Sequence, residues 1–187
     1  MVSEFEFVAV LISIVIGLGI AHLLGGVAQA VHERKQARFD AVHAAWTVSV
    51  FLVMVLNWWV LFTWRTHEGW TFDVFLLLIL WAVALYLLVV FLYPPRKDVG
   101  ESWAAVYESN RRWFLSTYAA MTLLDICITG VRGDLFDPPA YLPLAGHYFV
   151  LVVIGVFVSR RSYHKFVAWY ILCTGLLWSL VVRRFLA

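Results

Sequence analysis

The polar residues inside long apolar runs are those in this sequence that could do chemistry. His22 and Asp125 are ionisable and fall clearly inside such runs, and Asn57 adds an uncharged group that hydrogen-bonds strongly. An ionisable side chain in hydrocarbon is costly and usually faces the interior of a helix bundle or a water-filled cavity. A rise of about 1.5 Å per residue, counted from the basic ends of the runs, puts His22, Asp125 and Asn57 at depths of roughly 13, 18 and 22 Å. We therefore predict that the three side chains meet near the middle of a bilayer, with Asp125 as the partner of His22.

Asp125 also belongs to a polar stripe on its predicted helix. The steps between stripe members are three, four or seven residues, which place them on one helical face. The members are Arg111, Tyr118, Thr122, Asp125, Thr129 and Arg132. The stripe predicts a hydrated or hydrogen-bonded seam that acts as a proton relay or transport path. The alternative is that the threonines bond to their own helix and the ends anchor at the interface.

The run GLGIAHLLGG, residues 17 to 26, surrounds His22 with glycine. Gly17, Ala21, Gly25 and Ala28 share one helical face at four- and three-residue steps. Small residues at this spacing let two membrane helices approach closely. We predict that this face packs against another helix of the bundle or of a second chain. A glycine hinge or a substrate cleft beside His22 is the alternative.

Composition indicates a membrane protein. Of the 187 residues, 63% are hydrophobic and only 14% are charged, whereas a soluble domain has about 45–50% apolar and about 25% charged residues. The stretch from Val74 to Tyr93 carries no charge and has the roughly 20 apolar residues that a helix needs to cross a bilayer.

Hydropathy, breakers and charges predict an all-α, six-transmembrane-helix bundle without a soluble domain. The whole chain, 1–187, is expected to form a single integral membrane domain. The predicted spans are 5–31, 41–64, 71–93, 113–131, 141–158 and 166–182. The segment 101–112 has helical spacing and mixed polarity, and we expect it to lie at or beyond the interface as an amphipathic lead-in to the fourth span.

The basic residues favour one orientation. Ten Lys and Arg residues belong to one side of the predicted membrane and four to the other, which places both termini outside the cytoplasm of a bacterial-type inner membrane by the positive-inside rule. The second group is Arg65, Arg132, Arg183 and Arg184. On the cytoplasmic side, Arg160, Arg161 and Lys165 are candidates for binding anionic lipid headgroups, or they merely follow the positive-inside rule.

Several other activities are disfavoured. The sequence has no HExxH, CxxC or GxSxG motif and no glycine-rich phosphate loop, so we expect no metal, no cofactor and no acyl-transfer chemistry. A His22–Asp125 acid/base pair is conceivable in an enzyme, but no nucleophile accompanies it. The net charge of +2 is spread over short loops, which does not favour nucleic acid.

Three functions remain as hypotheses. The first is a small channel or carrier, oligomeric or with a membrane protein partner, that moves protons or another small ion or solute. The second is a non-catalytic membrane subunit or scaffold in which the His22–Asp125 contact is structural. The third is a membrane sensor whose buried histidine changes charge near neutral pH.

Overall fold

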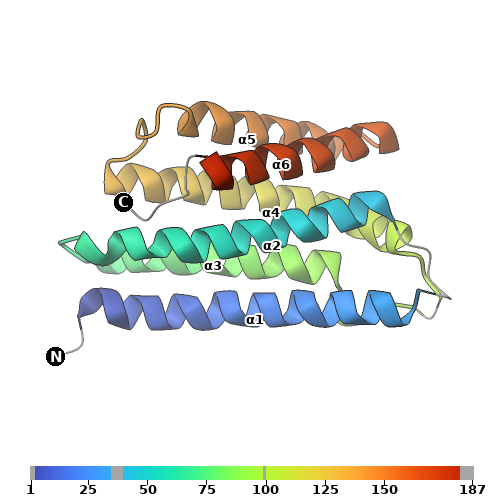
Figure 1. The fold of residues 1–187 in the computed structure, drawn as a ribbon, viewed down its shortest axis with the longest axis horizontal. Coiled ribbons are helices and arrows are strands. Elements are labelled where there is room, and N and C mark those ends of the chain that lie inside the picture. Colours follow the sequence, from blue (N-terminus) through green and yellow to red (C-terminus); the bar gives the residue numbers. More distant parts are fainter. Residues whose placement is uncertain (1–2, 35–39, 99, 182–187) are drawn as a thin grey trace.

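A computed structural model describes residues 3–34, 40–98 and 100–181, and all regular structure within these ranges is helical. The elements are α1 (Glu4–His32), α2 (Ala41–Leu61), the short 3-10 helix η1 (Phe62–Thr66), α3 (Phe72–Leu92), α4 (Trp103–Arg132), α5 (Tyr141–Phe157) and α6 (Arg161–Val181). They run up and down beside one another (Figure 1). The prediction of an all-helical bundle is therefore confirmed for these residues.

Among the described residues, five helices are long and apolar enough to cross a membrane: α1, α2 with η1, α3, α4 and α6. The remaining helix, α5, is apolar but shorter, with 17 residues, which is at the lower limit of spanning length. The predicted count of six spans thus corresponds to five full-length helices and one short one. This architecture is compatible with an integral membrane protein.

Side-chain caps explain where four of the helices begin. The hydroxyl of Ser3 accepts from the backbone N–H of Glu6, whose carboxylate in turn accepts from the backbone N–H of Ser3. Asp40 caps α2, Thr71 caps α3 and Ser102 caps α4 in the same first-turn geometry. Such caps satisfy N–H groups that a helix start leaves without a partner.

The predicted lead-in at 101–112 and the predicted fourth span, 113–131, belong to one helix. Trp103–Arg132 is continuous over 30 residues. No glycine or proline interrupts it before Gly130, and Trp103, Val106 and Tyr107 are buried. At about 45 Å, α4 exceeds the roughly 30 Å hydrocarbon core, so its first turns extend the bundle.

The sixth helix also begins earlier than predicted, at Arg161 rather than residue 166. Its predicted last residue, 182, lies outside the described part of the chain, as do Arg183 and Arg184.

The bundle has α1 at one side and α5 with α6 at the other (Figure 1). Helix α1 packs on α3 and α2, α3 packs on α4, and α4 packs on α5. Aromatic rings fill the centre, where Trp46 lies against Phe114 and Tyr118 with ring centroids 5.0 and 5.5 Å apart.

The last turns of α1, α3 and α5 and the first turns of α2, α4 and α6 lie together at one end of the bundle (Figure 1), which we call the basic end. There, Lys97 donates to Glu33 at 2.9 Å, and this bond lowers the pKa of the Glu33 carboxyl.

Arg161, one of the three predicted headgroup-binding residues, forms an ion pair with Asp40, so its charge is already engaged within the protein. Arg160 and Lys165 are exposed, and binding of lipid headgroups by the three residues stays a prediction.

Candidate functional site: an aromatic cavity around Asp125

A cavity of about 150 Å³ lies between α2, η1, α3, α4, α5 and α6. Five members of the predicted polar stripe line it: Tyr118, Thr122, Asp125, Thr129 and Arg132. The sixth member, Arg111, lies elsewhere on α4. The stripe is therefore a cavity wall over most of its length, because its residues share the face of α4 that turns into the bundle.

Asp125 contributes the carboxylate of this wall. Tyr141 of α5 donates a hydrogen bond to Asp125 Oδ2 at 2.8 Å, and the Thr129 hydroxyl donates to Tyr141 Oη at 3.0 Å. Thr129 is buried. A chain of hydrogen bonds between α4 and α5 thus orients the carboxylate.

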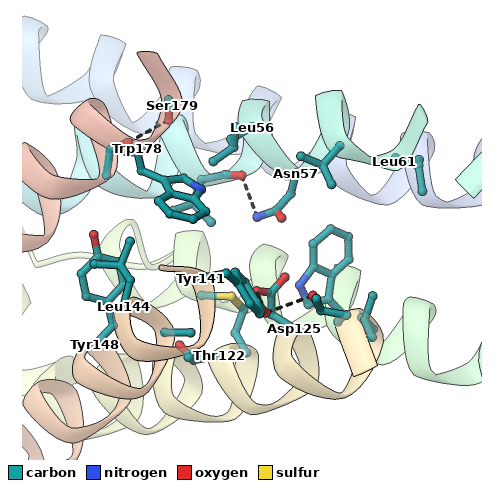
Figure 2. Close-up of a pocket in the computed structure, with 18 of the residues that line it drawn as sticks. Leu56, Asn57, Leu61, Thr122, Asp125, Tyr141, Leu144, Tyr148, Trp178 and Ser179 are labelled. Carbon is teal, nitrogen blue, oxygen red and sulfur yellow. Dashed lines mark hydrogen bonds between the residues drawn. The ribbon is translucent and has the colours of Figure 1, made fainter. Parts of the chain in front are cut away.

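Asn57 is the polar residue of the opposite wall. Its amide donates through Nδ2 to the Val53 carbonyl of its own helix at 2.8 Å. Figure 2 shows Asn57 projecting from α2 towards the side of the cavity that holds Asp125 and Tyr141, with Trp178 of α6 beside it. The structure thus brings Asn57 and Asp125 to one cavity, as the sequence predicted.

Arg132 stands at the end of α4, about two turns from Asp125 on the same face. Its Nε donates to Asp134 at 2.5 Å, and it also donates to the Thr63 hydroxyl. The guanidinium charge is therefore balanced at the edge of the cavity.

His22 does not lie in this cavity. Its Nε2 donates to the backbone carbonyl of Tyr93 at 2.7 Å, and its ring lies edge-on to Tyr86. Tyr93 follows the last residue of α3, where carbonyls have no partner in the helix. The structure assigns His22 to capping α3, so the predicted contact with Asp125 is not formed. The reason is that α1 packs against α3 and α2, whereas Asp125 faces α5.

The predicted small-residue face of α1 lies on the surface of the bundle. Gly17, Ala21, Gly25 and Ala28 are exposed on α1, so they do not pack within the bundle. The close approach is made by Gly19 and Gly26: a Cβ at Gly26 would lie 2.3 Å from the Tyr93 ring, whereas one at Gly25 would meet nothing within 4 Å.

Sequence reasoning missed the aromatic wall. Trp81, Trp178, Tyr141 and Tyr148 line the cavity, and the indole Nε1 of Trp81 is buried without a hydrogen-bond partner. The spacing of Tyr141 and Tyr148 at i and i+7 on α5 is the signal that places both on one face.

A second polar cluster lies at the basic end. Arg111, which is buried, reaches the Val158 carbonyl, the Ser159 hydroxyl at 3.3 Å and His164 Nε2 at 2.9 Å. His164 Nδ1 is 3.1 Å from Tyr107 Oη, which accepts from Trp46 Nε1 at 3.2 Å. This cluster joins α2, α4 and α6 to the end of α5, and its contacts are structural.

The described residues contain no group of three or more His, Cys, Asp or Glu side chains that could hold a metal ion. Comparisons of the chain with protein-family models, curated proteins and solved structures found no match. The cavity is therefore interpreted from its own geometry.

Proposed function

We propose that this protein is a small membrane channel or carrier that passes a proton, a small ion or a small solute through the cavity around Asp125. The observation that carries the proposal is a carboxylate on the wall of a cavity that lies between helices, four of which are long and apolar enough to cross a membrane. Ionisable residues within spans commonly mark ion and substrate pathways. His22 has no part in the proposed path, because it lies outside the cavity.

The proposed setting is a bacterial-type inner membrane with both termini outside the cytoplasm. The basic end, which carries Arg34, Arg96, Lys97 and Arg160, would then face the cytoplasm under the positive-inside rule. Asp125 would lie on a path between that end and the opposite surface.

The test is flux into liposomes that contain the purified protein. We expect wild-type protein to conduct protons or small cations, and Asp125→Asn to lower this flux at least tenfold because the charge that attracts the cation is lost. His22→Ala should keep its flux and melt at a lower temperature, since it loses only the bond to the Tyr93 carbonyl. Equal flux in wild type and Asp125→Asn, or no flux in wild type, would refute the proposed path.

A second candidate function is that of a membrane subunit that docks on a second copy or on another membrane protein. It is favoured by the exposed small-residue face of α1, because such faces allow close helix association.

This candidate predicts different effects for substitutions at two neighbouring glycines, one on association and the other on melting temperature. Gly25→Leu should weaken association and leave the melting temperature of the protomer unchanged, because a side chain there enters open space. Gly26→Leu should lower that melting temperature, because it clashes with the Tyr93 ring at a cost of about 1–3 kcal/mol. Crosslinking in membranes measures association, and unchanged crosslinking in Gly25→Leu would argue against this face as an interface.

A further inference from the structure

Several hydroxyl groups on the cavity wall donate their protons within the protein. Four hydroxyls donate in this way: Thr122 to the Tyr118 carbonyl, Thr129 to Tyr141, Tyr141 to Asp125, and Ser179 to the Gly175 carbonyl. A hydroxyl that has donated its proton has only lone pairs left to offer a solute. These four hydroxyls can therefore act only as hydrogen-bond acceptors towards a solute.

The polar groups of Asp125 and Asn57 also favour a solute that donates hydrogen bonds. Asp125 adds carboxylate oxygens to the acceptors, and the Asn57 amide adds a carbonyl oxygen beside an Nδ2 group that donates one of its two protons to Val53. The one described cation on the lining, Arg132, is engaged by Asp134 and Thr63 at the edge. A solute that brings N–H donors and a positive charge suits this set of groups, whereas an anion does not.

Aromatic rings form much of the remaining wall. Four of them belong to lining residues: Trp81, Trp178, Tyr118 and Tyr148. Indole and phenol faces attract cations within about 6 Å of the ring centroid, and they also bury apolar groups. Such a wall fits a solute that has both a cationic and an apolar part.

We propose that the cavity binds a small protonated amine that carries an apolar group about the size of a benzene ring. The size follows from the volume of about 150 Å³, because a cavity of about that volume engineered into another protein accepts benzene. The ammonium group donates to Asp125 and Asn57, and the ring lies against Trp81 and Trp178. This inference deepens the proposed function, since it names the solute class for the same cavity.

The experiment compares three probes of one shape by saturation-transfer NMR and calorimetry with the purified protein in detergent at pH 7. Benzylamine is cationic, benzyl alcohol is neutral and benzoate is anionic. We expect benzylamine to bind at least tenfold more tightly than either of the others. Asp125→Asn should lose this preference, and Asp73→Asn, which removes an exposed carboxylate from the first turn of α3, should keep it.

A second variant keeps the test decisive if Asp125→Asn does not fold. Asn57→Leu should weaken benzylamine binding several-fold and leave benzyl alcohol binding unchanged. Equal binding of the three probes, or no binding of benzylamine by the wild type, would overturn the amine assignment. Amine binding without flux would refute transport alone, whereas cation flux without amine binding would refute the solute class alone.

Discussion

Replacing Arg111 by leucine is expected to lower the free energy of unfolding by about 3–5 kcal/mol, the range for removing one partner from a buried charged contact. The side chain of Arg111 is 8% exposed. By the usual scaling for chains of 150–250 residues, this loss corresponds to a fall of about 6–20 °C in melting temperature.

The physical reason is that one guanidinium holds three helices together. It donates to the Val158 carbonyl at the end of α5, where helix carbonyls have no partner and positive charge is stabilising. It also contacts His164 of α6 at 2.9 Å and lies 3.6 Å from the carboxylate of Glu108 on its own helix. Leucine leaves the buried carbonyl and the histidine without this partner.

The matched control is the next residue along the chain. Arg112→Leu makes the same change of charge and shape on an exposed side chain, and it should shift the melting temperature by little. Arg111→Lys should fall between, because an ammonium keeps the charge and loses the planar set of donors. Melting followed by tryptophan fluorescence measures all three, and equal shifts for Arg111→Leu and Arg112→Leu would contradict this account.

The helices were predictable from the sequence because the signals along the chain are strong. Charge-free runs such as Val74–Tyr93 and the proline pair at 94–95 set the limits of α3 within one residue. The burial of the first turns of α4 was not predicted, because the mixed polarity of the segment 101–112 suggested that it lies at or beyond an interface. Tertiary packing buries Tyr107 and Arg111 there, and that packing leaves no periodic signal strong enough to outweigh the charges.

The sequence predicted which residues of α4 share the site, but it did not predict which other helices contribute to it. Helical spacing grouped Tyr118, Thr122, Asp125 and Thr129 correctly, because residues on one face of a helix must share a neighbour. Depth along a helix says nothing of which helices are neighbours, and for that reason His22 was paired with Asp125. The order of packing, with α3 against both α1 and α4, is a property of the whole fold.

Filling the cavity without changing its charged residues is expected to lower the proposed cation flux strongly. Ala145 is a buried residue of the lining on α5, one turn after Tyr141 and one turn before Tyr148. Ala145→Leu adds three carbon atoms to the wall between these tyrosines. We expect cation flux and benzylamine binding each to fall at least tenfold because the solute loses its space.

The same substitution should leave the melting temperature unchanged or raise it, because filling a cavity with apolar atoms commonly stabilises a protein. An unchanged or higher melting temperature would show that flux falls because the cavity is filled and not because the protein unfolds. Gly146→Leu is the control: it lies outside the lining, and a Cβ there meets nothing within 4 Å, so flux should persist. If Ala145→Leu remained folded and conducted like the wild type, the path would not pass through this cavity, and Asp125 would have to act on structure alone.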